Sequence, residues 1–324
     1  MFLMNRLNYN IFFCLFFILL NGFSLSAKVG RIVVSQDGSG NYKTIKEALA
    51  SVPDNNQKAI IIYIKNGNYK EKLVFGKLKT NIALIGEDVN KTIITYDDYA
   101  SKKDVNGKDI GTFGSYTVSI ECDNFIASNI TFENSSGPVG QAVAVAVGGD
   151  KVTFKNCRFL GSQDTVYTFG NTSRQYFYNC YIEGTVDFIF GAAVAVFEQC
   201  EIFCKRGGYI TAASTPEGQD YGYVFLNSKI TGIAPENSVY LGRPWRPFAK
   251  VVFINTEMPA LIRKLGWHNW GKVTNEQTAF YAEYQNKGEG FKPDERVAWS
   301  RQLTATEAKL YTLKAIFKDW EPKK

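Results

Sequence analysis

A short phrase recurs along the middle of this chain, and it limits the possible folds more than any other feature of the sequence. Each copy has an aromatic residue, then Asn or Gln two positions later, then a small residue and an apolar side chain. The Asn or Gln positions, counting one looser copy at the start, are Asn129, Asn156, Asn179, Gln199, Asn227 and Asn255. Successive copies are 27, 23, 20, 28 and 28 residues apart. Repeats of this length, built from short alternating apolar and polar runs, are typical of a β-solenoid whose coils stack along one axis.

Stacked coils place equivalent side chains about 4.8 Å apart, the spacing of neighbouring strands. We expect each copy to form one strand of one coil, with the Asn and Gln side chains in an amide ladder. Beside it, Cys157, Cys180 and Cys200 are predicted to form a small buried apolar ladder. Metal binding through Cys200 and Cys204 is the alternative, which we disfavour because the chain holds one histidine. Five cysteines follow residue 27, and an odd count does not indicate a closed disulfide framework.

The N-terminus has the pattern of a secretory signal peptide, which we place at residues 1–27. Arg6 supplies the positive charge, Ile11–Leu20 the apolar core, and Ser24–Ala27 a small-residue cleavage zone. A membrane anchor is the alternative, but an apolar run of 10 residues is too short to span a bilayer. No second hydrophobic span follows. We therefore expect a secreted protein, periplasmic or extracellular, that leaves the membrane once the signal peptide is cleaved.

The remaining chain, residues 28–324, has no Pro/Gly/Ser-rich linker and is predicted to form a single domain. A capping box at Thr44–Glu47 opens a helix over Thr44–Ser51, which is expected to cover the exposed strand edges of the first coil. Thr304–Phe317 has helical spacing and is expected to pack late in the chain. The predicted fold class is therefore all-β, a solenoid with an N-terminal capping helix and a C-terminal helical tail.

The charge balance is mildly basic, with a net charge of +6 at pH 7, or +5 once Arg6 is removed with the signal peptide. This balance is compatible with an acidic partner such as an acidic polysaccharide. Lys and Arg are scattered rather than gathered in a stripe, so we expect no nucleic-acid partner. A G-x-S-x-G elbow, a Walker loop and an H-E-x-x-H motif are all absent from the sequence.

Three polar residues interrupt runs that are otherwise apolar or glycine-containing: Gln141, Asp164 and Asp187. Their numbers differ by 23 and 23, and each aspartate lies eight residues after the Asn of its own coil. Three neighbouring coils are therefore expected to place these side chains on one face, about one strand spacing apart.

Two carboxyl groups that close repel when both are ionised, so one is expected to hold a proton while the other stays charged. This pairing supplies a general acid and a nucleophile from one residue type. The side-chain amides of Gln141 and Gln163 offer N–H groups to a developing oxyanion. Arg243 offers a bidentate partner for an ionised aspartate, and Trp245 an aromatic surface for a sugar ring. A solvated row of acids or a structural calcium site is the alternative interpretation of the two aspartates.

Seven motifs, in order along most of the chain, resemble the pectin methylesterase (pectinesterase) family. They are Asp37–Tyr42 (DGSGNY), Gly67–Glu71 (GNYKE), Ile130–Asn134 (ITFEN), Gln141–Ala144 (QAVA), Gln163–Thr165 (QDT), Gly184–Gly191 (GTVDFIFG) and Leu241–Trp245 (LGRPW). One such motif would be weak, whereas seven in the same order are specific. The segment Thr211–Pro216 looks more like bacterial members than plant ones, so we expect the bacterial type.

The resemblance implies a right-handed, single-stranded parallel β-helix and an esterase that uses no metal or other cofactor. It implies that Asp187 is the nucleophile on the methyl-ester carbonyl, and that Asp164 protonates the departing methanol and then activates water. The other residues it implies are Gln141 and Gln163 as the oxyanion hole, Arg243 as the residue that positions the nucleophile, and Thr112, Gln141, Arg243 and Trp245 as substrate contacts.

The implied reaction is hydrolysis of the methyl esters of polygalacturonate, with methyl-esterified homogalacturonan as the partner of a monomeric enzyme. A pectin lyase or a polygalacturonase is a second possible function, but a polygalacturonase of that fold carries a Gly-His-Gly segment, which this sequence lacks. An inactive polysaccharide-binding solenoid is a third, disfavoured because both aspartates, both glutamines and the arginine are present.

Overall fold

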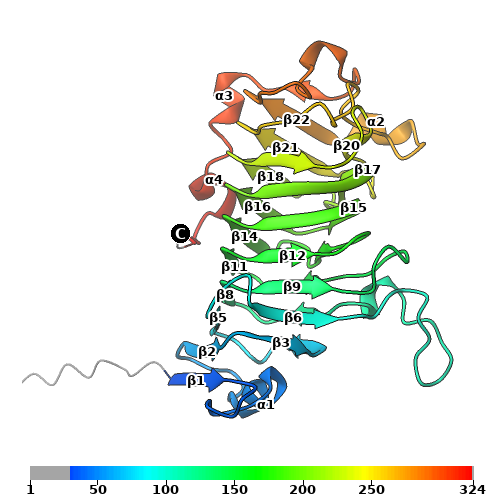
Figure 1. Ribbon diagram of the computed structural model, residues 1–324. Helices are drawn as coiled ribbons and strands as arrows, with labels where there is room; N and C mark the ends of the chain where they lie inside the picture. Colours follow the sequence, from blue (N-terminus) through cyan, green and yellow to red (C-terminus); the bar gives the residue numbers. More distant parts are fainter. Residues whose placement is uncertain (1–29, 323–324) are drawn as a thin grey trace, which may run out of the picture.

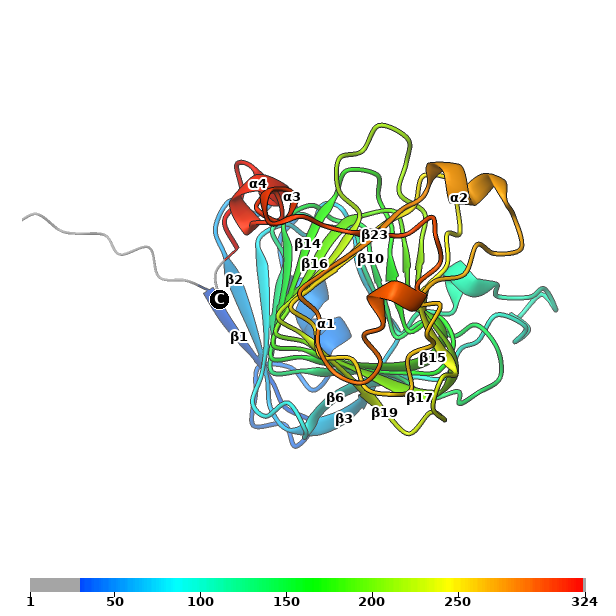
Figure 2. The same cartoon turned by 90° about the horizontal axis from the view of Figure 1, so that it is seen from above.

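The computed structural model describes residues 30–322, and in this range the chain winds through short strands stacked along one axis (Figure 1). The strands pair in parallel from the first coil to the last. Seen along the axis, they enclose the interior, with helices α3 (Ala305–Ala308) and α4 (Leu313–Phe317) outside one face (Figure 2). The predicted parallel β-helix is confirmed. The signal peptide expected at residues 1–27 lies outside the described residues.

Two hydrogen-bonded sheets of 11 and 12 strands form the walls of this β-helix. In spatial order the first sheet holds β1 (Gly30–Val34), β2 (Ile60–Ile64), β5 (Ile82–Gly86), β8 (Ile126–Ser128), β11 (Val152–Lys155), β14 (Arg174–Tyr178), β16 (Val194–Glu198), β18 (Tyr223–Leu226), β21 (Lys250–Ile254), β22 (Phe280–Tyr284) and β23 (Arg301–Gln302).

The second sheet covers the remaining faces, because the long strand β15 (Tyr181–Gly191) pairs with β12 (Arg158–Leu160) through its first residues and with β13 (Val166–Thr168) through its last. Its path is β3 (Gly67–Lys70), β6 (Thr92–Tyr96), β9 (Thr131–Asn134), β12 (Arg158–Leu160), β15 (Tyr181–Gly191), β13 (Val166–Thr168), β10 (Val145–Val147), β7 (Val118–Ile120) and β4 (Leu73–Phe75), and β17 (Glu201–Ala213), β19 (Lys229–Gly232) and β20 (Val239–Gly242) extend it beside β15.

The sequence repeat marks a corner of each coil. The aromatic residue of a copy lies in the first sheet, and the residues after the Asn or Gln continue into the second. All six Asn or Gln positions have a positive φ, between 49° and 55°, a left-handed conformation that Asn adopts more readily than most residues. Our expectation that each copy forms a single strand was wrong, because the left-handed residue turns the chain between two sheets.

The predicted amide ladder runs along this corner. Nδ2 of Asn179 donates to Oδ1 of Asn156 at 2.7 Å, and Nδ2 of Asn255 donates to Oδ1 of Asn227 at 3.1 Å. A longer contact of 3.5 Å links Asn156 to Asn129. The ladder is confirmed at these steps, and each amide ties one coil to the next.

Replacing Asn179 by alanine is expected to destabilise the fold by about 2 kcal/mol, because left-handed alanine and the lost hydrogen bond each cost about 1 kcal/mol. The matched variant Asn179→Gly adopts the same φ without strain and is expected to lose only the hydrogen-bond share. Urea unfolding of both variants beside the wild type measures the difference. Equal destabilisation by the two substitutions would contradict a role for the backbone conformation.

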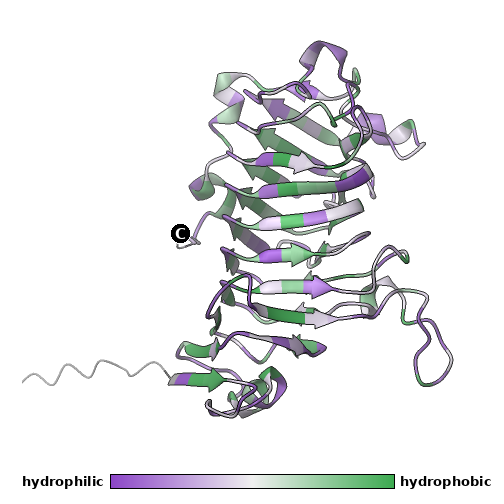
Figure 3. Ribbon diagram, in the orientation of Figure 1, coloured by the Kyte–Doolittle hydropathy of each residue, from purple (hydrophilic) through white to green (hydrophobic). Residues whose placement is uncertain are grey.

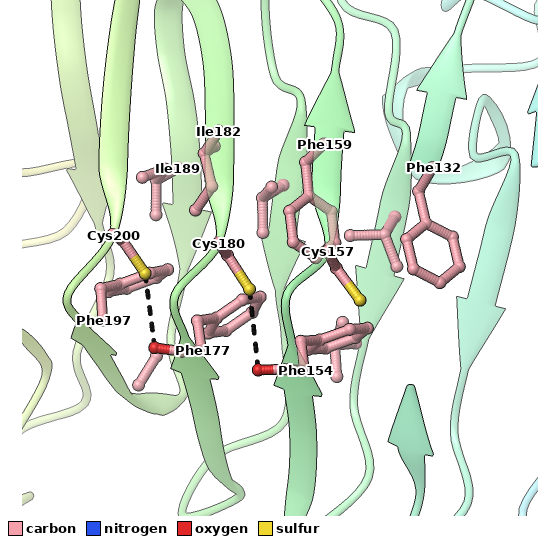
Figure 4. Packing of buried hydrophobic residues seen from close by; sticks show 14 of the residues in the cluster. Phe132, Phe154, Cys157, Phe159, Phe177, Cys180, Ile182, Ile189, Phe197 and Cys200 are labelled. Atoms are coloured by element: carbon pink, nitrogen blue, oxygen red, sulfur yellow. Dashed lines mark hydrogen bonds between the residues drawn. The ribbon is translucent and has the colours of Figure 1, made fainter. Parts of the chain in front are cut away.

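Ladders of like side chains fill the interior (Figure 4). Cys157, Cys180 and Cys200 are buried in one row, and burial raises the pKa of the Cys157 and Cys180 thiols. The thiols of Cys180 and Cys200 donate to the carbonyl oxygens of Phe154 and Phe177 on the preceding coil, at 3.6 and 3.4 Å. Phenylalanine rings of successive repeats stack beside them, with centroids 4.2 to 4.9 Å apart. The cysteine ladder is confirmed as part of the apolar core.

Apolar and polar residues alternate along many strands, as the changing colours of the strands in Figure 3 show. In β3, for example, Tyr69 is buried while the polar residues on either side, Asn68 and Lys70, are exposed. This two-residue period follows from the geometry of a strand, which sends successive side chains to opposite faces. Within residues 30–322, no helix combines the length and the apolar character needed to cross a membrane.

Helix α1 (Ile45–Ser51) lies against the first coil, at the base of the stack in Figure 1. Thr44 caps it, and Thr44 and Glu47 exchange both hydrogen bonds of a capping box. Its residues Ile45 and Ala48 are fully buried and belong to the hydrophobic core. The predicted capping helix is confirmed.

The C-terminal tail forms two short helices, α3 (Ala305–Ala308) and α4 (Leu313–Phe317), where we expected one. The break lies at Thr312, which is extended and accepts a hydrogen bond from the N–H of Ala315 as the cap of α4. Ile316 and Phe317 are buried against the outer face of the first sheet. The tail therefore runs back beside the middle coils (Figure 1). Three more short helices lie in loops: η1 (Thr112–Gly114), α2 (Thr274–Thr278) and η2 (Pro293–Glu295).

Candidate active site

One groove on the wall of the β-helix, with a volume of about 290 Å³, is lined by all seven residues predicted for the site. These residues are Thr112, Gln141, Gln163, Asp164, Asp187, Arg243 and Trp245. Phe113, Phe190, Ala212 and Trp270 complete the lining. The groove therefore gathers residues that are up to 158 positions apart in the sequence, from Thr112 to Trp270.

The two aspartates lie on neighbouring coils in the register that their spacing predicts. Val166 pairs with Ile189, a step of 23 residues, and the N–H of Asp164 donates to the carbonyl oxygen of Val186 at 3.2 Å. Gln141, however, pairs with Gln163, a step of 22. The equal spacing of 23 expected for Gln141 was wrong in register, because this coil is shorter than the next one: Val145 pairs with Val166, a step of 21, whereas Val166 pairs with Ile189, a step of 23.

Both aspartates have a left-handed backbone, with φ of 67° at Asp164 and 52° at Asp187. Apart from Gly, Asn and Asp adopt this conformation most readily, and such positions often occur at functional sites. Each aspartate is only 7% exposed. The fold therefore holds two buried carboxyl groups at one place, which a simple solvated row of acids does not require.

Asp187 is paired with Arg243 through both carboxylate oxygens. Nε of Arg243 donates to Oδ1 at 2.9 Å, and Nη2 donates to Oδ2 at 2.7 Å. Such a fork fixes the orientation of the carboxylate and favours its charged form. Burial raises the pKa of Asp187, and the hydrogen bonds and charge of Arg243 oppose that rise.

Asp164 has the opposite environment. Among the described residues, no salt bridge reaches its carboxyl group. Burial, reinforced by the negative charge of Asp187, raises its pKa from 3.8 to about 8, with a smaller opposing effect from Arg243. At neutral pH one acid therefore carries a proton while its neighbour is tied to a cation, which is the division that the sequence predicted.

Arg243 lies between two aromatic rings. Its guanidinium carbon is 3.9 Å from the ring centroid of Tyr209 and 3.8 Å from that of Trp270. Contact with the faces of these rings leaves the N–H groups at the edge of the guanidinium free for the bonds to Asp187. The clamp restricts the arginine to the orientation that the carboxylate needs.

An aromatic wall lines the groove on the side of η1. Phe113 lies 5.1 Å from Tyr167 and 6.4 Å from Trp245, and Phe190 lies 6.0 Å from Trp245, measured between ring centroids. Phe113 is 56% exposed, which leaves its ring available to a ligand. Faces of this kind suit the apolar faces of sugar rings.

Sequence analysis missed Trp270, Tyr209 and Phe113. Trp270 belongs to the segment Trp267–Trp270, which also holds the single histidine of the sequence. A usable signal was the pair of tryptophans three residues apart in a polar loop, and for Phe113 its position directly after Thr112. Tyr209 gave no signal, because its ring meets Arg243 only through the stacking of coils.

The β-helix and its groove define a class of protein: a solenoid that presents an arginine-bound acid and a protonated acid to a ligand lying beside aromatic side chains. Residues 31–319 match the family model described as Pectinesterase. Pectinesterase 31 of Arabidopsis thaliana is 46% identical over 288 residues, covering 87% of this chain and 90% of that protein. The chain belongs to the pectinesterase family.

Solved structures agree. Pectin methylesterase from carrot superposes with a TM-score of 0.82 at 36% identity, covering 90% of this chain and 94% of that one. A pectin methylesterase in complex with hexasaccharide VII has a TM-score of 0.79 at 32% identity, covering 92% of this chain and 100% of that one.

The bacterial type expected from Thr211–Pro216 gains no support from these relatives. A pectin methylesterase from Erwinia chrysanthemi is 31% identical, with a TM-score of 0.79 and coverage of 91% of this chain and 98% of that one. The plant proteins from Arabidopsis thaliana and carrot are more similar, at 46% and 36% identity. A segment of six residues is too short to outweigh similarity along the whole chain.

Asp164 offers a test of the site that is independent of activity. Folding raises its pKa from 3.8 to about 8, so the folded state favours the protonated carboxyl group. The contribution of this group to the stability of the fold is therefore complete below pH 3.8 and is lost as the pH rises through about 8. Asp164→Asn removes this ionisation and is expected to be more stable than the wild type at pH 9, by up to about 5 kcal/mol from a shift of this size. Thermal unfolding at pH 5 and pH 9 measures the change. A variant no more stable than the wild type at pH 9 would contradict the raised pKa.

Proposed function

We propose that this chain hydrolyses the methyl esters of polygalacturonate in pectin and releases methanol, with Asp187 as the nucleophile and Asp164 as the general acid and base. One observation carries the proposal: two buried carboxyl groups share a groove but differ in their partners. Arg243 donates hydrogen bonds to both carboxylate oxygens of Asp187, whereas the carboxyl group of Asp164 has a raised pKa and forms no salt bridge among the described residues. A nucleophile must be ionised and an acid protonated at the same pH, and these environments favour that division.

In the first half of the reaction, an oxygen of Asp187 attacks the carbonyl carbon of the methyl ester. The negative charge that develops on the carbonyl oxygen is stabilised by N–H groups of the Gln141 and Gln163 side chains. When the tetrahedral species collapses, the bond to the methoxy group breaks and Asp164 donates its proton to the departing oxygen. Methanol leaves, and the galacturonyl group is joined to Asp187 as an acid anhydride.

In the second half, Asp164 is ionised and accepts a proton from water as the water attacks the same carbonyl carbon. The bond to Asp187 then breaks, giving galacturonic acid, which loses its proton to the solvent, and leaving both carboxyl groups in their starting states. Arg243 holds Asp187 in one orientation through both steps, so the leaving carboxylate is stabilised by the same fork that prepared it for attack. Asp164 therefore regains from water the proton that it gave to methanol.

The groove supports a polymeric substrate. Trp245 and Thr112 lie beside the acid pair, and the ring of Phe113 is exposed at the rim. A sugar ring lying on these aromatic faces presents its ester to the aspartates while neighbouring units of the chain extend along the wall. Methyl-esterified homogalacturonan has this chemistry, and a related enzyme has been solved with a hexasaccharide. We further propose that the enzyme acts as a monomer outside the cell, exported through residues 1–27.

Incubation of the purified enzyme with highly methylated pectin tests the proposal. Methanol release without new reducing ends or unsaturated products is the expected result. Unsaturated ends would indicate a lyase and new reducing ends a polygalacturonase, and either result without methanol would overturn the proposal. Binding to pectin with no product of any kind would leave the chain as a polysaccharide-binding solenoid.

A further inference from the structure

His268, the only histidine in the sequence, lies beside the groove without lining it. The proposed reaction does not use it. Its backbone N–H donates to the carbonyl oxygen of Gly242 at 3.1 Å, next to Arg243, and the preceding Trp267 pairs with Gly242 as well. The histidine is therefore fixed to the strand that delivers the arginine of the site.

The side chain of His268 supports the backbone of Trp270. Its Nδ1 accepts a hydrogen bond from the N–H of Trp270 at 3.0 Å. Trp270 has a φ of 62°, an unfavourable conformation for a bulky residue. The hydrogen bond closes a tight loop of three residues, in the way that an Asn or Asp side chain stabilises a turn two residues ahead. Asn269 makes the equivalent bond to the N–H of Gly271 at 2.8 Å.

Trp270 in turn packs on Arg243, whose guanidinium carbon lies 3.8 Å from the tryptophan ring. Arg243 makes both of its short bonds to Asp187. A continuous chain of contacts therefore runs from the imidazole of His268, through the strained turn, to the carboxylate of Asp187.

We propose that His268 is a positioning residue: its unprotonated Nδ1 holds Trp270 in the left-handed conformation that keeps Arg243 bound to Asp187. This inference rests on the proposed function, since it assigns the ester reaction to Asp187. An acceptor at Nδ1 requires the neutral imidazole with its proton on Nε2. His268 acts through Trp270 and does not touch the reacting groups.

The surroundings of His268 favour its neutral form. Burial and the charges of Arg243 and Arg263 lower its pKa. The rings of Tyr209 and Tyr240 lie 5.6 and 5.4 Å from the imidazole, between centroids. Two cations and two tyrosine rings therefore surround the imidazole, and no carboxylate among the described residues forms a salt bridge with it.

Two substitutions distinguish the role of the hydrogen bond at Nδ1 from that of the imidazole ring of His268. His268→Phe keeps an aromatic ring against Tyr209 and Tyr240 but has no acceptor. His268→Asn loses the ring, while its Oδ1 reaches the N–H of Trp270 as in an Asx turn. On methylated pectin at neutral pH, His268→Phe is expected to lower kcat about tenfold, because small misplacements of a reacting group cost rate steeply. His268→Asn is expected to stay within about twofold of the wild type.

Melting temperatures of both variants accompany the kinetics. If His268 only stabilises the fold, both variants lose activity in proportion to the fall in their melting temperatures. In that case His268→Asn does not keep the activity that His268→Phe loses. Wild-type kcat in His268→Phe, or an equal loss in both variants, would overturn the proposal.

A second measurement tests the proposal without requiring enzymatic activity. Because His268 is the only histidine in the sequence, nitrogen NMR of the full chain without a histidine tag reports its imidazole unambiguously. The expected spectrum at neutral pH is the neutral tautomer with the proton on Nε2. A proton on Nδ1, or a charged ring, would overturn the positioning role even if the enzyme is active. An enzyme that releases no methanol while showing the expected tautomer would count against the proposed function instead.

Discussion

Replacing Asp187 by alanine is expected to lower the rate of methanol release from methylated pectin by at least about 10⁴-fold. Without the carboxylate no acyl-enzyme forms, and only the oxyanion donors and the bound geometry remain to assist water. The loss should fall almost wholly on kcat, because the aromatic wall that binds sugar rings is unchanged. Steady-state kinetics, with methanol detected by alcohol oxidase, measures kcat and KM.

The companion variant Asp187→Asn distinguishes loss of the nucleophile from damage to the fold by the alanine substitution. Alanine is strained at the φ of 52° found at this position, and it leaves Arg243 without a partner in a site where the arginine side chain is 19% exposed. Asparagine tolerates the left-handed conformation and still accepts one hydrogen bond from Arg243. Both variants are expected to be inactive, with the asparagine variant close to wild-type stability by thermal unfolding. Near-normal turnover in either folded variant would refute the assignment of the nucleophile.

Replacing Asp164 by asparagine is expected to lower kcat by about 10³-fold, within the range usual for loss of a general acid and base. The methoxide ion is a poor leaving group, so the step that needs the proton becomes rate-limiting. The effect should be smaller on esters with a better leaving group, since these need less protonation. A p-nitrophenyl ester that the groove accepts, compared with methylated pectin, measures the difference.

The pH dependence of the wild type follows from the same carboxyl group. Asp164 works as an acid only while protonated, and its pKa is about 8. Activity is therefore expected to fall as the pH rises through about 8, and to fall at low pH once Asp187 is protonated. In Asp164→Asn the alkaline fall is expected to disappear from the residual activity. An alkaline limb that persists unchanged in this variant would assign it to another group.

The repeat predicted the fold because its period and its alternation are local properties of the chain. A phrase of about six residues that recurs every 20 to 28 residues leaves few architectures other than a stack of coils. The amide and cysteine ladders followed directly, since stacking places equal positions above one another. The capping box of α1 was equally local, because Thr44 and Glu47 are three residues apart.

Several features needed more than the pattern. The left-handed φ of the ladder residues turned each repeat into a corner, a backbone property that a hydrophobic pattern does not contain. The extra residue between Gln141 and the next pairing changed one register by a single position. The cap at Thr312 divided the expected C-terminal helix, since a local hydrogen bond outweighed the helical spacing.

The sequence by itself determined the class of fold and brought Asp164 and Asp187 to one groove, because their spacing of 23 residues matches one turn of the coil. Only the tertiary structure decided how the two acids differ. The difference comes from Arg243 and the rings of Tyr209 and Trp270, which arrive from later coils and loops. A pKa depends on burial and on charges a few ångströms away in space, and neither is written in the order of residues along the chain.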